Sequence, residues 1–331
     1  MKQKLRYIFF ITLYYLGIGY IIKSYNNKKN RIPILLFHRI SDIKDNFWEP
    51  LPVKYFDKLI KFISKHYDII TIDYLLENKS KNLKNKCIIT FDDGYKDFLE
   101  NAYPILQKYN IKSTLFVTVN PVNTNSLIWT SELNKAIENT TKNTLELTFN
   151  NKLNKYNISN TLQKQKVAFN LLQILKNISN KEQNKIISQI KTKLNYTKPD
   201  NINFLNWNDI NKLKTQVNIQ SHSLTHSFMT TLTDNELDEE LIMSKKILSD
   251  KTNTNIKYFS YPIGDYNNNV IEKTKKYYTS AFIVSDNLVE VNKLSNNNYK
   301  YKIPRINITD KSVYEVFFRI NGFHTFVKKI K

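Results

Sequence analysis

Two short clusters hold the residue types that this chain could use for chemistry. The first is Thr90-Phe91-Asp92-Asp93-Gly94-Tyr95, and the second is Ser221-His222-Ser223-Leu224-Thr225-His226. Together they offer one carboxylate and two imidazoles to a divalent metal, and they leave a second carboxylate to accept a proton. Three protein ligands, an open position for water and a nearby base are what a metal-assisted hydrolase needs.

The spacing within each cluster suits this chemistry, although either cluster alone has a simpler explanation. Turn or helical geometry places His222 and His226, four residues apart, on one side of the chain. An Asp-Asp-Gly sequence after a strand is also typical of a turn in which Asp caps backbone amides. Both clusters follow nearly apolar runs, so we expect both at the ends of strands, where the two sets of ligands can meet.

Short apolar runs of strand length alternate with amphipathic stretches along most of the chain. A helix is predicted over 53–65, with Phe56, Leu59, Ile60 and Ile63 on one face, and another over 237–248, with Asp234 as its cap. The predicted strands are 32–37, 69–71, 87–91, 113–119, 217–221, 258–261, 281–284 and 302–306. This alternation predicts an α/β fold with a parallel sheet, closed or nearly closed into a (β/α) barrel.

The candidate chemistry falls where such a barrel would place it. His38, the Asp pair, His222 and Pro262 each follow a predicted strand. Active sites of these barrels lie at the C-terminal ends of the strands, so the motifs and the predicted fold agree.

Residues from about 126 to 203 interrupt the alternation. A short helix over 132–138 precedes a predicted hairpin with one arm at 145–149, and two helices follow over 162–178, capped by Ser159 or Thr161, and 182–194. We interpret the block as one insertion after a barrel strand. It is either a lid or substrate-binding edge, or a packing appendage.

Composition excludes a disordered chain and argues against nucleic-acid binding. Hydrophobic residues make up 41% of the 331 residues, enough for a large core. The formal charge of +21 reflects a Lys- and Asn-rich bias along the whole chain, without basic runs interleaved with aromatics. At most, the charge tethers the protein to anionic surfaces. The single cysteine, Cys87, is predicted to be a small buried hydrophobe.

The N-terminus resembles a secretory signal that is not cleaved. Lys2, Lys4 and Arg6 precede an apolar run over 7–22, which Lys23 follows. No small-x-small cleavage site is present, and the run is short for a spanning helix, which needs about 20 residues. We therefore expect residues 1–25 to be a hydrophobic signal-anchor and residues 26–331 to be a domain facing the periplasm or the cell exterior. The alternatives are a cleaved signal peptide, giving a secreted protein, and a monotopic anchor on the cytoplasmic face.

The two clusters also resemble the motifs of a known family, the polysaccharide deacetylases, which are carbohydrate esterases with the NodB-type fold. Thr90-Phe91-Asp92-Asp93-Gly94 matches the first motif of the family, and the 221–226 cluster matches the second. Phe259-Ser260-Tyr261-Pro262-Ile263-Gly264 looks like a variant of the third. The resemblance covers roughly 32–310, apart from the insertion, and implies a distorted (β/α) barrel that removes acetyl groups from amino sugars.

The resemblance also implies roles for the clustered residues. Asp93, His222 and His226 would hold one divalent metal, with zinc expected first and cobalt, nickel or iron as alternatives. Asp92 would be the general base, since a metal-bound water has a pKa low enough for a carboxylate to take its proton. The backbone N–H of Tyr95 would help the metal to stabilise the oxyanion.

Two positions depart from the common pattern of the family. The start of the domain, 32–40, resembles the poly-N-acetylglucosamine deacetylase branch, in which an early His is the general acid; by analogy His38 takes this role here, and His324 is the alternative. Ser260 stands where most members have an Arg that pairs with the base. Arg305, at the end of the last predicted strand, could replace that Arg and keep Asp92 ionised.

Aromatic residues near the motifs could bind the sugar rings. Tyr261, Pro262 and Tyr266 are expected to shape the groove wall, and Trp129 and Trp207 either stack on sugars or belong to the core.

The interpretation that follows is a metal-dependent de-N-acetylase acting on an acetylated amino-sugar polysaccharide at the cell surface or in export. It would meet the membrane through its N-terminal segment and would bind no nucleic acid. The alternatives are an O-acetyl esterase acting on a glycan, and a non-catalytic polysaccharide-binding protein that has kept the fold.

Overall fold

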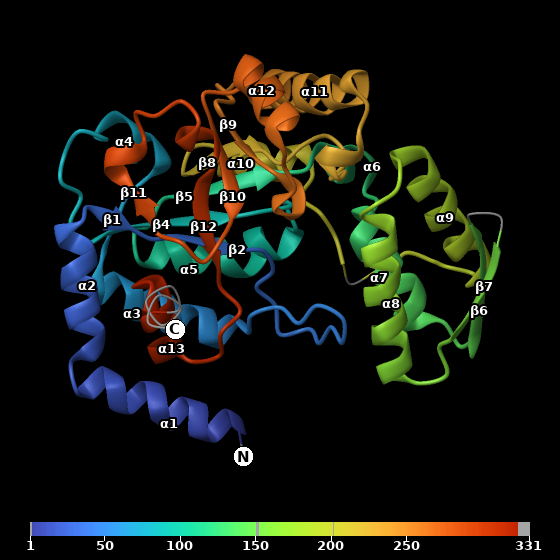
Figure 1. The fold of residues 1–331 in the computed structure, drawn as a ribbon, viewed down its shortest axis with the longest axis horizontal. Helices are drawn as coiled ribbons and strands as arrows, with labels where there is room; N and C mark the ends of the chain where they lie inside the picture. The colour runs from blue at the N-terminus through green and yellow to red at the C-terminus, as the bar shows by residue number, and fades with distance from the viewer. Residues whose placement is uncertain (1, 150–151, 201, 324–331) are drawn as a thin grey trace.

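Seven parallel strands form a closed barrel in the computed structural model, which describes residues 2–149, 152–200 and 202–323 (Figure 1). The ring follows the chain order, and the last strand pairs with the first. The barrel strands are β2 (Ile34–Phe37), β4 (Lys86–Phe91), β5 (Ser113–Val117), β8 (Val217–Ser221), β9 (Tyr258–Ser260), β10 (Ser280–Val284) and β12 (Ile303–Asn307). Every pairing in the ring is parallel, so all the C-terminal ends open on the same side.

The structure corrects the strand predictions at two places. The run over 69–71 contributes only β3 (Asp68–Ile69), which pairs with β4 outside the ring, because Thr71 already caps the next helix. The run over 32–37 is broken at Pro33, which has no N–H to donate. Its first part, β1 (Arg31–Ile32), pairs instead with β11 (Val289–Glu290) in an antiparallel sheet.

Helices cover the outside of the barrel, and their side chains pack against the strands to form the main hydrophobic core. They are α3 (Val53–His66), α4 (Ile72–Glu77), α5 (Tyr103–Lys108), α6 (Val119–Thr124), α10 (Trp207–Leu213), α11 (Asp234–Thr252), α12 (Asn268–Tyr277) and α13 (Val313–Ile320). Single-turn segments are η1 (Phe98–Ala102), η2 (Met229–Thr231), η3 (Pro262–Gly264), η4 (Val291–Lys293) and η5 (Tyr299–Tyr301). The predicted cap of α11 is wrong by one residue, since Thr233 and Glu236 form the capping box.

The block at about 126–203 stands to one side of the barrel, at the right of Figure 1. It contains α7 (Trp129–Asn139), the hairpin β6 (Thr144–Phe149) and β7 (Lys152–Asn157), α8 (Thr161–Leu175) and α9 (Asn180–Lys193). The predicted hairpin and both helices are present, although Asn160 caps α8 rather than Ser159 or Thr161. The block has a hydrophobic core of its own, which includes Leu133, Leu147, Leu171 and Ile190.

The apolar N-terminal run forms two helices, α1 (Lys2–Tyr15) and α2 (Ile18–Lys28), on the opposite side of the barrel from the block (Figure 1). Within the described residues, no single helix is long and apolar enough to cross a membrane. The pair from Lys4 to Lys28 meets the length and composition of a span only when both helices are counted together, and it is bent by 65°.

Candidate active site

The predicted metal-ligating and acid–base residues meet at the C-terminal mouth of the barrel, because each follows or belongs to a parallel strand that opens on that side. The residues at or just beyond strand ends are His38 after β2, Asp92 and Asp93 after β4, His222 after β8 and Ser260 at the end of β9, whereas Arg305 lies within β12. The register aligns them directly: Phe37 pairs with Phe91, and Ser221 pairs with Phe259.

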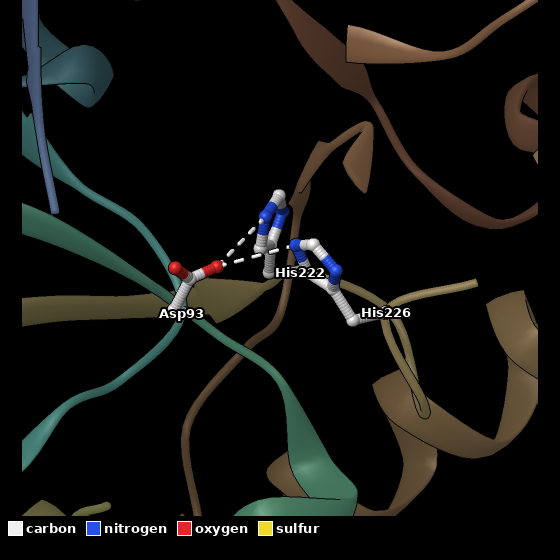
Figure 2. A group of neighbouring side chains, drawn as sticks. All are labelled: Asp93, His222 and His226. Atoms are coloured by element: carbon white, nitrogen blue, oxygen red, sulfur yellow. Dashed lines mark ion pairs between the residues drawn. The ribbon is translucent and has the colours of Figure 1, made fainter. Parts of the chain in front are cut away.

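Asp93, His222 and His226 form a buried group whose ligand atoms all lie within 4.8 Å of one another (Figure 2). The Asp93 Oδ1 atom is 3.4 Å from the Nε2 atom of His222 and 3.3 Å from that of His226. This buried oxygen accepts no hydrogen bond within the described part of the chain. One carboxylate oxygen and two imidazole nitrogens that converge on a single point are a donor set that fits a divalent metal.

The protein fixes the orientation of both imidazoles. Nδ1 of His222 donates a hydrogen bond to the carbonyl oxygen of Ser260 at 2.8 Å, which leaves Nε2 to face Asp93. His226 is held by its backbone: its N–H donates to Ser223 Oγ at 2.9 Å, and its carbonyl accepts from the indole N–H of Trp129 at 2.9 Å. Trp129, one of the two predicted stacking candidates, therefore positions a site residue.

The carboxylate of Asp93 and the imidazole of His222 shift each other's pKa values. Burial opposes ionisation of Asp93, but the imidazoles of His222 and His226 that face its carboxylate hold its pKa well below the ordinary value. Burial also opposes protonation of His222, yet the carboxylates of Asp92 and Asp93 raise its pKa. The site therefore favours an ionised Asp93 and concentrates negative charge where a cation would bind.

Glu240 supports the second motif and was not identified from the sequence. It lies on the buried side of α11, and its Oε2 atom accepts hydrogen bonds from the backbone N–H groups of Leu224 at 2.8 Å and Thr225 at 3.0 Å. The available signal was a carboxylate within an apolar stripe, since Leu237 and Leu241 are its buried neighbours on the helix.

Asp92 is held by a two-pronged ion pair rather than by the histidines. Arg305 donates from Nη1 to Asp92 Oδ1 at 2.6 Å and from Nη2 to Asp92 Oδ2 at 2.7 Å. Burial opposes ionisation, but Arg305 keeps the pKa of Asp92 below its ordinary value. Ser260 stands where most members of the family have an Arg, and the sequence predicts no role for it. In the structure its hydroxyl donates to Asp92 Oδ2 at 3.1 Å and also bonds to Arg305.

A cavity of about 370 Å³ opens over these groups. Its lining combines the site with apolar and polar side chains from three loops and the block: His38, Phe47, Trp48, Asp92, Asp93, Ile128, Thr130, Ser131, Asn134, Leu172, His222, His226, Ile263, Val284 and Asn307. The block therefore contributes directly to the cavity wall through α7 and α8, which favours the substrate-edge interpretation over a remote appendage.

His38 lies in this cavity, where its ring meets the indole of Trp48 edge to face, with centroids 5.2 Å apart. Burial lowers the pKa of His38, against the opposing effect of the Asp93 and Asp92 carboxylates. His324, the alternative acid, lies outside the described residues.

Tyr95 is placed to act only through its backbone. Its side chain is not part of the cavity lining: it packs on Phe204 with centroids 4.4 Å apart and bonds through its hydroxyl to Ser131, which does line the cavity, at 2.7 Å. In the described part of the chain, no acceptor is found for its backbone N–H.

The structure corrects the predicted groove wall. Tyr261 and Pro262 are buried, and Tyr261 stacks in the core on Phe259 and Tyr266 rather than in the cavity. Tyr266 is partly buried against the same core. Their neighbour Ile263, in a left-handed conformation with φ 57°, lines the cavity instead. Trp207 likewise does not line it, and its indole bonds to Asn123.

Comparisons with known proteins agree with this arrangement. The family model for polysaccharide deacetylase matches residues 79–139 and 137–281, together more than half of the chain. A curated Bacillus subtilis (strain 168) protein named "Putative polysaccharide deacetylase YxkH" is 36% identical over 94 residues. That match covers 27% of this chain and 33% of the relative, so the chain spans about a third of the curated protein.

Two solved structures share the fold. The Streptococcus pyogenes deacetylase PplD superposes with a TM-score of 0.59 at 18% identity, covering 88% of this chain and 98% of that one. IcaB from Ammonifex degensii superposes with a TM-score of 0.56 at 13% identity, covering 88% and 97%. At this identity the likeness concerns the fold alone. The family match, together with a barrel of the NodB type, shows that the chain belongs to the polysaccharide deacetylase family.

Proposed function

We propose that this protein is a metal-dependent hydrolase that removes N-acetyl groups from the amino sugars of a cell-surface or exported polysaccharide. One observation carries the proposal: an Asp/His/His group and a separately paired carboxylate lie side by side at the base of one cavity. Family membership supports the acetylated polysaccharide as the class of substrate.

Asp93, His222 and His226 would hold the metal, with zinc as the first choice for two imidazoles and one carboxylate. When bound, such an ion lowers the pKa of water and polarises a carbonyl. The three side chains need little rearrangement, because His222 is already oriented by Ser260 and His226 by its backbone contacts.

Asp92 is the proposed general base. The Arg305 pair favours its ionised form, so it can accept a proton from the attacking water near neutral pH. The backbone N–H of Tyr95 is the proposed donor to the oxyanion that develops on the acetyl carbonyl.

His38 is the proposed route for the proton that the leaving amine needs. It lies on the Trp48 side of the cavity, where burial lowers its pKa and the two neighbouring carboxylates partly offset that effect. Trp48 and Ile263 offer apolar faces against which a sugar ring could pack.

We also propose that the catalytic domain lies outside the cytoplasmic membrane. A catalytic domain outside the cytoplasmic membrane would reach a surface polysaccharide, and the apolar N-terminal segment is the part of the chain that would keep it there.

The test uses the full chain, stripped with a chelator and then supplied with zinc, cobalt or nickel. We expect acetate release from N-acetylglucosamine oligomers to require added metal and to fall by about a thousandfold or more in Asp92→Asn. Metal binding should persist in that variant, because Asp92 is not among the three converging ligands. Asp68→Asn, at an exposed carboxylate, is the matched control and should keep full activity.

Two outcomes would contradict the proposal. Release from acetylated xylan but not from the glucosamine oligomers would replace the N-deacetylase with an O-acetyl esterase. Stoichiometric metal without release from either substrate would favour a binding protein.

A further inference from the structure

The N-terminal helices present large apolar side chains to solvent. These side chains, here called the outer face, are Leu5, Ile8, Phe9, Leu16 and Ile21. Leu5, Ile8 and Phe9 recur at helical spacing on α1, so they lie on one side of it. Leu16, between the two helices, and Ile21, on α2, are 67% and 66% exposed. Large apolar surfaces exposed to solvent mark sites of interaction.

The opposite side of the same helices belongs to the fold. Phe10 is buried against Phe318, with ring centroids 5.6 Å apart, and Arg6 forms an ion pair with Glu315 on α13. The buried Asn26 donates a hydrogen bond to the carbonyl oxygen of Asn321 at 2.7 Å. One apolar side of these helices is already packed on the fold. The other apolar side is exposed, so we expect it to contact a second apolar surface.

Close packing at Gly19 shows how tightly α2 fits. A Cβ atom built at this position would lie 2.6 Å from the Phe317 ring, so only glycine allows the contact. The docked arrangement therefore depends on residue choices within the apolar segment itself.

Spanning a bilayer would require these contacts to break. The chain turns at Gly17, which has φ 77°, and each arm is too short alone: the 14 residues of α1 cover about 21 Å, against a hydrocarbon thickness of about 30 Å. Straightening the 65° bend would carry Arg6 and Asn26 away from Glu315 and Asn321 and place polar groups in lipid.

The surroundings of the outer face identify its partner. Tyr15, Tyr20 and Tyr25 are exposed beside it, and tyrosine is enriched at the membrane–water interface. Exposed Lys4 lies near one end of the helix pair and Lys28 and Lys29 at the other, on a chain with a formal charge of +21. Apolar side chains bordered by tyrosines and cations match a bilayer that contains anionic lipids.

We propose that α1 and α2 lie in the plane of a membrane, with the outer face inserted into one leaflet and the inner face still packed on α13. The barrel is then held at the lipid surface in a fixed orientation. The loop that follows Asn307 of the cavity runs beside α1, since Thr309 and Ser312 share a hollow of about 590 Å³ with Lys4 and Tyr7, so the helix pair is joined to one edge of the barrel mouth.

The first experiment measures sedimentation of the full chain with vesicles and does not depend on catalysis. Wild type should bind vesicles of phosphatidylcholine and phosphatidylglycerol more tightly than phosphatidylcholine alone, and the difference should shrink at high salt. Leu16→Glu with Ile21→Glu should weaken binding by roughly a hundredfold or more. The matched control is Leu162→Glu with Phe169→Glu, which changes side chains of similar type and exposure, 76% and 62%, on α8 and should bind like wild type.

The second experiment separates in-plane docking from a span. Cys87 is buried, so Lys4→Cys and Lys28→Cys each add one accessible thiol. With protein bound to sealed vesicles, an impermeant maleimide added outside should label both variants. Protection of only one of the two positions would show that the pair spans the bilayer and would overturn the proposal. Failure of the wild type to bind vesicles, or equal loss of binding in the α8 control, would do the same.

Discussion

At the scale of single residues, two adjacent carboxylates have different principal partners, although His222 lies within 3.8 Å of both. Asp93 adopts a left-handed conformation, with φ 76°, that directs it to His222 and His226, whereas Asp92 faces Arg305. The guanidinium of Arg305 is fully buried and matches both oxygens of Asp92, a geometry that a lysine cannot reproduce. The pairing with Arg305 distinguishes Asp92 from Asp93 although both follow the same strand. In the proposed mechanism, Asp93 then holds the cation while Asp92 accepts the proton.

His38 offers the sharpest prediction at this scale. We expect His38→Gln to lower kcat for acetate release by about a hundredfold to ten-thousandfold, since the leaving amine loses its proton donor. Metal affinity should change little, because His38 is not one of the three converging ligands. The comparison is His324→Gln, which should remain close to wild type. If His324→Gln loses the activity and His38→Gln keeps it, the assignment of the acid is reversed.

At the scale of elements, α11 holds the loop that carries both histidines. Glu240 accepts two backbone N–H groups of this loop, and Ser223 Oγ accepts a third from His226. Such contacts fix the loop in a conformation that includes left-handed φ values at Ser223 and His226. The arrangement of Asp93, His222 and His226 therefore depends on a helix that contributes none of these three residues.

Glu240→Gln tests this dependence. The neutral amide keeps the shape of the side chain but loses the charge-assisted acceptance, so we expect metal affinity to fall by about tenfold to a hundredfold. Competition with a chromogenic chelator measures the change. Glu239→Gln, one residue away on the exposed side of α11, is the control and should leave affinity unaltered. Equal effects of the two substitutions would indicate a general charge effect instead.

What the sequence predicts well at this scale is the position of strand ends. Apolar runs place Asp92, His222 and Arg305 at the mouth of the barrel, because parallel strands share one direction. The sequence does not predict the direction of a side chain when that direction depends on distant partners. Tyr261 follows a strand end as the Asp pair does, yet Phe259 and Tyr266 draw it into the core. Ser260 acquires its role from contacts with Asp92 and Arg305, which lie 168 and 45 positions away in the chain, so no local pattern encodes it.

At the scale of the whole molecule, buried charges join the barrel to the block. Asp97, at the start of η1, pairs with Arg39 at 3.0 Å, and Arg39 pairs with Asp45 at 3.4 Å. Lys135 on α7 is the last member of this series of ion pairs, with a contact to Asp45 at 2.9 Å. Because the loop that carries Asp45 also carries Trp48, this network fixes one wall of the catalytic cavity. Removing a single partner from such a buried chain costs about 3–5 kcal/mol.

Asp97 makes the network sensitive to pH. Burial raises the pKa of Asp97 from its ordinary value of 3.8 to about 6, in spite of the opposing effect of Arg39. The folded protein thus binds this proton more tightly than the unfolded chain does. Its contribution to stability is fully present below pH 4 and is lost as pH rises through 6.

Asp97→Asn carries a permanent mimic of the protonated acid and should lack this pH dependence. Between pH 4 and pH 7, the unfolding free energy of wild type should fall relative to that of the variant by up to about 3 kcal/mol. Urea titrations at a series of pH values measure the difference. Asp68→Asn, at a carboxylate that is 72% exposed, should run parallel to wild type throughout. A constant offset between wild type and Asp97→Asn would mean that Asp97 is ionised at every pH tested, so that the Arg39 pair outweighs burial and the network holds the block with a full charge.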